Sequence, residues 1–111
     1  MPPKNLMPEE DFEFQLRRYR ELAIAAADLR REAARMETDR AEWVGNQIMA
    51  KVEAGLPVTR ADKEVHADAK HREFQRQVAT LSAEAAKDEI LARVAELRCL
   101  YLTARREGVP A

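Results

Sequence analysis

Apolar side chains recur along this chain at alternating intervals of three and four residues, the spacing that places them on one side of an α-helix. In the first half such a series runs over 19–43, with Arg40 as its one charged member. In the second half one series runs over 74–85 and another, shifted by one position, over 86–104. The members of this last series are Ala86, Ile90, Val94, Leu97, Tyr101 and Ala104. The pattern predicts two long helices, since a helical period of about 3.6 residues produces such shifts against a repeat of 3.5.

Proline and glycine divide the chain into two parts of similar length. Pro8 precedes three acidic residues, which favours a helix start because carboxylates stabilise the positive end of the helix dipole. Gly55 and Pro57 end that helix, since glycine adopts the left-handed C′ conformation and proline cannot continue the hydrogen bonds. Thr59 with Asp62 resembles a capping box and begins a second helix. The predicted segments are an N-terminal extension over 1–7, a helix over 8–54, a loop over 55–58, a helix over 59–107 and a tail over 108–111.

A connection of about four residues makes the two helices antiparallel neighbours. Turning the chain at Pro57 places opposite each other positions whose numbers add to about 114. Trp43 is then near His71 or Phe74, Tyr19 is near Val94 or Ala95, and Phe12 is near Tyr101. The predicted fold is all-α, a single long antiparallel two-helix hairpin that resembles a coiled coil.

Two helices cover only one seam, so apolar surface beyond that seam has no partner within the chain. The end of the hairpin away from the loop carries more apolar residues than one seam needs, and Leu100 and Leu102 cannot both face the neighbouring helix. We therefore expect a homo-oligomer, either a bundle or a ring. The predicted interface residues are Phe12, Phe14, Leu16, Leu91, Leu100 and Leu102.

The composition agrees with long solvated helices and limits the possible functions. Of the 111 residues 35% are charged, more than the average of about 25%. Nineteen basic and 20 acidic residues leave a formal charge of −1, which excludes a generally basic coat for nucleic acid. No run of about 18 uncharged apolar residues occurs, and no apolar segment follows the first four residues. We expect a cytoplasmic protein with no membrane span and no signal peptide.

The residue types that commonly catalyse reactions or bind metals form no recognisable motif. His66 and His71 are five residues apart, about 140° around a helix, and therefore do not share a face. Cys99 is the only cysteine, which excludes an intrachain disulfide and a cysteine-based metal cluster. Most carboxylates lie three or four residues from a basic residue, which is typical of ion pairs on a solvated helix. We interpret both histidines as surface residues and predict a non-enzymatic protein with no metal, cofactor or small-molecule substrate.

The segment Trp43-Val44-Gly45 matches the Trp-x-Gly turn of small secreted helical-hairpin proteins. In those proteins the motif lies in the turn between the helices, whereas here the turn residues Gly55 and Pro57 come about ten residues later. We therefore interpret Trp43 as a structural residue near the loop end of the seam.

Arginine accounts for 14 of the 19 basic residues and favours bidentate contact with phosphate. A solvated helix face explains many of these side chains, but two groups cluster in the antiparallel register. The candidate DNA-binding residues are Arg17, Arg18, Arg20, Arg98 and Arg105, with a second group of Arg40, Arg72 and Arg76. Glu21 and Glu96 reduce the positive charge of the first group. Only Tyr19 offers base stacking among these arginines, so binding would depend mainly on phosphate contacts.

The order of segments resembles a group of small phage proteins. A first helix rich in Ala, Arg and Glu ends with Trp43 and the segment 49–54, a short loop follows, and the second helix begins with Thr-Arg-Ala-Asp-Lys-Glu-Val over 59–65. The chain resembles helical-hairpin proteins of tailed bacteriophages encoded near recombination genes, some of which are recombination mediators. The resemblance implies an oligomeric accessory that binds single-stranded DNA and a recombinase in the bacterial host cytoplasm.

The same residues are also consistent with a second function. A non-enzymatic protein–protein oligomer, such as a virion assembly factor or an inhibitor of a host protein, requires the same helices and the same apolar excess. Such a protein would not bind nucleic acid, whereas a recombination accessory would bind it with an affinity that falls steeply as salt is added.

Overall fold

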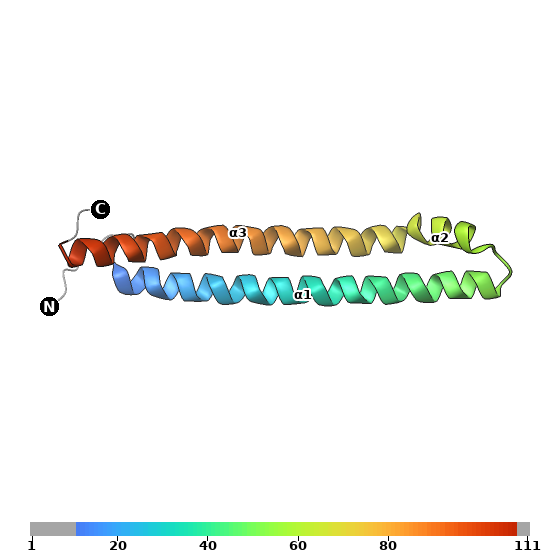
Figure 1. Ribbon diagram of the computed structural model, residues 1–111, viewed down its shortest axis with the longest axis horizontal. Coiled ribbons are helices and arrows are strands. Elements are labelled where there is room, and N and C mark those ends of the chain that lie inside the picture. The colour runs from blue at the N-terminus through green and yellow to red at the C-terminus, as the bar shows by residue number, and fades with distance from the viewer. Residues whose placement is uncertain (1–10, 109–111) are drawn as a thin grey trace. The chain divides into compact units, whose positions relative to one another are not determined.

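The computed structural model describes residues 11–108. Within them the chain forms no strand and three helices, α1 (Phe12–Glu53), α2 (Val58–His66) and α3 (Ala69–Arg106), as Figure 1 shows. The prediction of an all-α chain is confirmed. The expected extension over 1–7, the helix start at Pro8 and the last three residues of the tail lie outside the described residues.

Asp11 begins α1. Its Oδ1 accepts a hydrogen bond of 3.2 Å from the backbone N–H of Phe14, and its carbonyl accepts one of 3.0 Å from Gln15. This is the N-cap arrangement, in which a carboxylate satisfies an amide that the first turn leaves without a partner. The helix then continues through Gly45 to Glu53.

Gly55 ends α1 as the sequence predicts. Its φ of 104° lies in the left-handed region, where a side chain would be strained. The N–H of Gly55 donates to the carbonyl of Val52, and the N–H of Leu56 donates to that of Lys51, both at 3.0 Å. These two bonds form a Schellman motif, which satisfies the last carbonyls of the helix.

The start of α2 differs from the predicted capping box. Pro57 occupies the N-cap position with φ −60° and ψ 146°, and no side chain caps the helix. Thr59 already lies inside the helix, so the expected pairing of Thr59 with Asp62 is wrong. The fixed φ of proline suits the beginning of a helix without a capping side chain.

The prediction of one unbroken second helix over 59–107 is also wrong, because the helix is interrupted at Ala67 and Asp68. The N–H of Asp68 donates to the carbonyl of Val65, one residue closer than in an α-helix. Asp68 then caps α3, since its Oδ1 accepts a hydrogen bond of 2.8 Å from the N–H of Lys70. The Arg72 guanidinium donates to the carbonyl of Ala67 at 2.9 Å. These side chains satisfy backbone groups that the break exposes.

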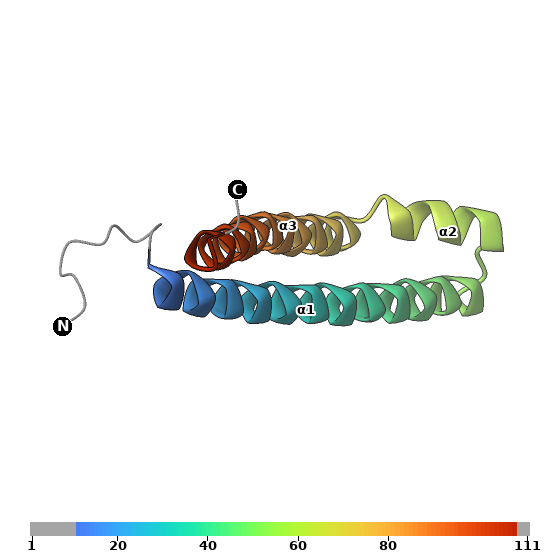
Figure 2. The ribbon, with the colours of Figure 1, turned by 60° about the vertical axis from the view of Figure 1, so that its left-hand side comes forward.

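The helices belong to two compact units. Unit 1 contains residues 11–28 and 84–108. In it the beginning of α1 and the end of α3 lie side by side and antiparallel (Figures 1 and 2). The buried residues of unit 1 are Gln15, Ala26, Ala85, Ala92 and Ala95. All of these except Gln15 are alanines, which lets the two helices approach closely.

Unit 2 contains residues 29–83, with the end of α1 packed against α2 and the beginning of α3. Its buried residues are Ala33, Ala61, Val65 and His71. The Lys51 Nζ lies 3.3 Å from Glu64 Oε2, and the Trp43 ring is stacked on His71 and tilted against Phe74. These contacts confirm the antiparallel register predicted from a turn at Pro57.

Candidate functional site

A face of large apolar side chains in unit 1 is exposed. Ile90, Val94, Leu97 and Tyr101 follow one another on α3 at intervals of four, three and four residues, and their exposed fractions are 66%, 39%, 48% and 50%. We call these four residues the outer stripe. Each of them except Tyr101 lies within two positions of a buried alanine, at Ala92 or Ala95. Positions two apart on a helix point about 160° apart, so the outer stripe lies opposite the seam.

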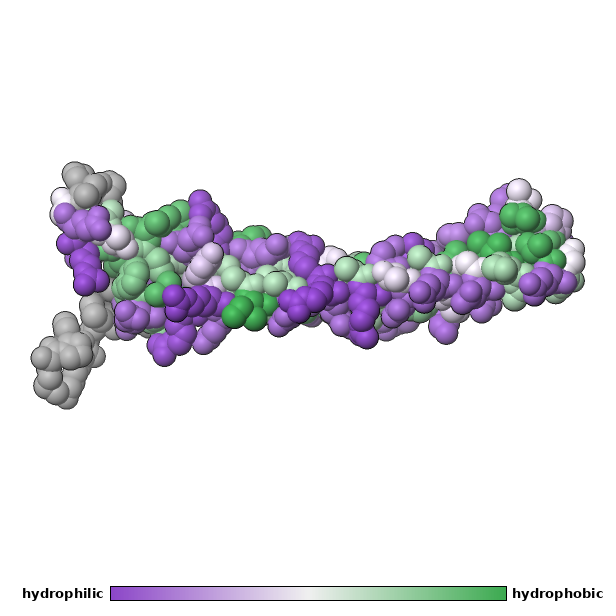
Figure 3. Space-filling model, turned by 60° about the horizontal axis from the view of Figure 1, so that its bottom comes forward, coloured by the Kyte–Doolittle hydropathy of each residue, from purple (hydrophilic) through white to green (hydrophobic). Residues whose placement is uncertain are grey.

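The outer stripe resolves the choice between Val94 and Ala95 for the seam, because Val94 is exposed and Ala95 is buried. The seam receives Ala85, Ala92 and Ala95, which also follow a helical spacing. The side chains that α3 buries in unit 1 are all alanines, whereas the four large side chains of the outer stripe face solvent. Figure 3 shows apolar surface where α1 begins and α3 ends in unit 1.

The predicted oligomer-interface residues all lie in unit 1, with different exposure. Leu100 is exposed, at 58%. The other five, Phe12, Phe14, Leu16, Leu91 and Leu102, are half-buried. Leu100 lies three residues after Leu97 and extends the exposed apolar surface beside the outer stripe. The sequence analysis included Leu100 in the interface but not Ile90 or Val94, because the spacing of these two residues fits either face of the helix.

The first arginine group also lies in unit 1. Its members, Arg17, Arg18, Arg20, Arg98 and Arg105, are all exposed. Within residues 11–108 none of them forms an ion pair. Glu96, which was expected to weaken this group, forms an ion pair with Arg93 instead. Among residues 11–108, no carboxylate occupies these five guanidinium groups.

The second arginine group lies in unit 2, and each of its members has a partner. Arg40 donates to Glu37 and lies 3.1 Å from His71 Nε2, and Arg72 donates to a backbone carbonyl. Arg76 makes three hydrogen bonds to Glu73, of 2.7, 2.8 and 3.0 Å. The Arg76 guanidinium and the Gln77 amide hold the pKa of Glu73 below its ordinary value. A phosphate would have to replace these partners, so this group is a weaker candidate.

The interpretation of both histidines as surface residues is wrong for His71, which is 3% exposed. The break between α2 and α3 brings the rings of His66 and His71 to 4.8 Å between centroids, although a continuous helix would turn them apart. His71 Nε2 faces the Arg40 guanidinium, and its Nδ1 has no hydrogen-bond partner within the described residues. No group of three or more metal-ligating side chains occurs among residues 11–108.

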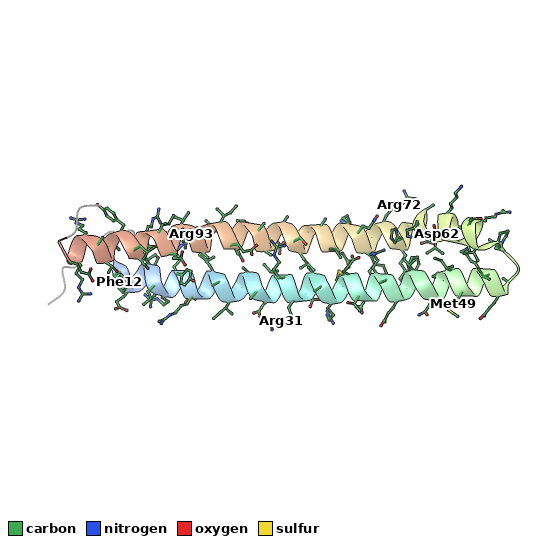
Figure 4. The ribbon with its side chains drawn as sticks, viewed as in Figure 1. Phe12, Arg31, Met49, Asp62, Arg72 and Arg93 are labelled. Carbon is green, nitrogen blue, oxygen red and sulfur yellow. The ribbon has the colours of Figure 1, made fainter. Side chains whose placement is uncertain are left out.

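Trp43 packs where the sequence predicts. It is half-buried, its ring centroid lies 6.5 Å from that of His71, and the Lys70 Nζ lies 5.8 Å from the ring centroid. Trp43 thus holds α1 to the beginning of α3. Figure 4 shows other side chains of unit 2, with Arg31 and Met49 on the outer side of α1 and Arg72 on the outer side of α3.

Unit 2 also contains a groove of about 340 Å³ between α1 and α3. Met36 and Leu81 line it together with polar residues that include Glu32, Glu73 and Arg76. Both carboxylates are held by arginines, Glu32 by Arg35 and Glu73 by Arg76. The pKa of Glu73 is lowered by Arg76 and Gln77, so this carboxylate is poorly suited to take up a proton near neutral pH.

No helix within the described residues is both long and apolar enough to cross a membrane. The comparisons with known proteins give no relative from which a function could be transferred. No protein-family model, no curated protein and no solved structure matches the chain.

Proposed function

We propose that this chain is a non-enzymatic helical protein that works by self-association, and that the outer stripe of α3 forms the contact. The observation that carries the proposal is the placement of four large apolar side chains on the solvent side of α3, while the residues that α3 buries in unit 1 are alanines. Contiguous apolar surface on a soluble protein commonly marks an interaction site.

The energetic argument favours a reversible contact. Full burial of one aliphatic side chain contributes about 1.5–3 kcal/mol relative to full exposure. The stripe side chains are already partly covered, so each contributes less than this. Association also costs translational and rotational freedom. We therefore expect an oligomer that dissociates on dilution.

The chain offers a matched pair of isoleucines for the test. Ile90 and Ile24 are exposed to nearly the same extent, 66% and 63%, and both lie in unit 1, but only Ile90 belongs to the outer stripe. Sedimentation equilibrium of the full chain over a range of concentrations should show a wild-type oligomer. Ile90→Glu should abolish it, whereas Ile24→Glu should leave it intact. A wild type that stays monomeric at high micromolar concentration would exclude this function.

Single-stranded DNA binding is the second candidate, because the five arginines of the first group are exposed and form no ion pair within the described residues. Together with the resemblance to phage proteins encoded near recombination genes, this supports an oligomeric recombination accessory that also contacts a recombinase. Phosphate contacts would supply most of the affinity.

A salt titration tests this second function. A labelled strand of about thirty nucleotides exceeds one site of roughly 4–16 nucleotides. Binding should weaken steeply with salt, and Arg17→Glu, Arg18→Glu and Arg20→Glu together should abolish it while helix content is retained. Arg35→Glu is the matched control, because Arg35 is exposed but already paired with Glu32. A wild type that does not bind the strand at low salt leaves the protein-only oligomer.

A further inference from the structure

The charges beside the outer stripe identify its occupant. One flank of the stripe carries Glu84, Leu91, Arg98 and Arg105 at intervals of seven residues, with its acidic member at one end and a basic member at the other. Residues seven apart lie on the same side of a helix, so this flank of α3 is acidic at its N-terminal end and basic at its C-terminal end. Within the described residues neither Glu84 nor Arg105 forms an ion pair.

We propose that the outer stripe binds the same stripe of a second copy of this chain, with the two α3 helices antiparallel. This rests on the proposed function and names its partner and geometry. Ile90 of one copy then packs against Tyr101 of the other, and Val94 packs against Leu97. A twofold axis between positions 94 and 97 produces each contact twice, which closes the assembly as a dimer.

Charge complementarity favours this direction. In an antiparallel pair of helices the same flank of each copy lies together in reversed order, so Glu84 meets Arg105 of the second copy at both ends. In a parallel pair opposite flanks meet, and Arg93 would face Arg98 of the second copy twice. Like charges at such positions oppose pairing, and opposite charges support it. The sequence thus favours the antiparallel pair of helices and disfavours the parallel pair.

The sequence also favours one register of the antiparallel contact over the registers shifted by seven residues. Shifting the antiparallel register by seven residues in one direction places Lys87 among the large apolar side chains, and shifting it in the other places Arg98 against Arg98 of the second copy. Only the central register pairs all four stripe residues. The stripe covers about 16 Å of helix, so the contact is short and the dimer should be concentration-dependent.

Charge reversal tests the register in the full chain. Glu84→Arg and Arg105→Glu should each raise the dimer dissociation constant about tenfold, because each replaces two attractions by two repulsions. The two substitutions together should restore the wild-type value, since the pair is present with its charges exchanged. Arg106→Glu is the matched control, because Arg106 is the next residue and points away from the flank.

Cross-linking tests the direction. In a Cys99→Ser background, a mixture of Ile90→Cys and Tyr101→Cys chains should form the mixed disulfide on mild oxidation, and Ile90→Cys alone should not form a disulfide dimer. Efficient cross-linking of Ile90→Cys to itself would establish a parallel pair and overturn the inference, while the proposed self-association would stand. A trimer or larger particle, or charge reversal without effect, would also overturn it.

A monomeric wild type would exclude both proposals. If Ile90→Glu lowered the unfolding free energy of such a monomer, a segment of the same chain would cover the stripe. A dimer that Ile24→Glu abolished and Ile90→Glu left intact would place the contact elsewhere and overturn the inference alone.

Discussion

The ring of His71 is stacked on the ring of Trp43, with the centroids 6.5 Å apart and the planes inclined by 18°. This contact joins α1 to the beginning of α3, just after the break between α2 and α3, where Asp68 caps α3. His71 is buried there beside Arg40, and Phe74 adds a second ring 5.9 Å from Trp43. The stability of unit 2 should therefore depend on this cluster.

Trp43→Ala should lower the free energy of unfolding by about 2–4 kcal/mol. Loss of a fully buried tryptophan costs about 3–5 kcal/mol, and Trp43 is only half-buried. Urea unfolding followed by circular dichroism measures the change. Met49→Ala is the control, since Met49 is 62% exposed and should cost less than about 1 kcal/mol. Equal effects of the two substitutions would show that the Trp43 contacts do not stabilise the fold.

Asp68→Ala should destabilise the protein by about 1 kcal/mol, because it removes the side chain that caps α3. The sign of the change in stability distinguishes a broken second helix from an unbroken one. If the second helix were unbroken, alanine at this position would stabilise it, since alanine has the higher helix propensity. Thermal unfolding measures the change, and Asp68→Asn should retain most of the stability because asparagine also caps helices. An increase in stability with Asp68→Ala would show that the helix is not broken between α2 and α3.

Glu64 should titrate below its ordinary value of 4.5, because hydrogen bonds from Lys51 and Arg60 favour its charged form and lower its pKa. A group with a lowered folded-state pKa stabilises the fold above the unfolded value, and this contribution is lost as the pH falls through the folded value. The Glu64 ion pairs should therefore support unit 2 at neutral pH and weaken in acid.

Carboxyl titration by nuclear magnetic resonance tests this. Lys51→Met should raise the pKa of Glu64 more than Arg60→Met does, since Lys51 has the larger effect. A wild-type Glu64 that titrates at or above 4.5 would show that the bridge between α1 and α2 does not form in solution.

Part of this structure is predictable from local sequence. Gly55 and Pro57 mark the turn, and the register around it brings Trp43 to His71 as expected. The break at Ala67 and Asp68 is not predictable in the same way, because neither residue is a glycine or a proline. Asp68 begins α3 through a side-chain hydrogen bond from the N–H of Lys70, which an aspartate on an unbroken helix surface would not make.

The outer stripe as a whole was not predicted, for a different reason. α3 carries two apolar series of helical spacing, a small one through Ala92 and Ala95 and a large one through Val94 and Leu97. Hydrophobicity favours the larger side chains for the seam, but the close approach of two helices favours the smaller ones. Periodicity alone cannot decide between two such faces. Exposure in the folded chain identifies the large series as the outer one.

Two glycines provide a last prediction, with opposite signs. Gly45 lies inside α1, and a Cβ added there would meet no atom within 4 Å. Gly45→Ala should therefore stabilise the protein by about 0.5–1 kcal/mol, the helix-propensity difference between the two residues. Gly55 has equally open surroundings, but its φ is 104°, where alanine is strained. Gly55→Ala should destabilise the protein by about 1 kcal/mol or more.

Because neither substitution creates a clash, the comparison isolates backbone conformation from packing. Chemical unfolding of both variants beside the wild type measures the two changes under the same conditions. A stabilising Gly55→Ala would mean that α1 continues past Ala54 and that the Schellman turn is absent. A destabilising Gly45→Ala would mean that an interaction partner approaches the helix closely at that glycine, since within the described chain nothing stands in the way of the added methyl group.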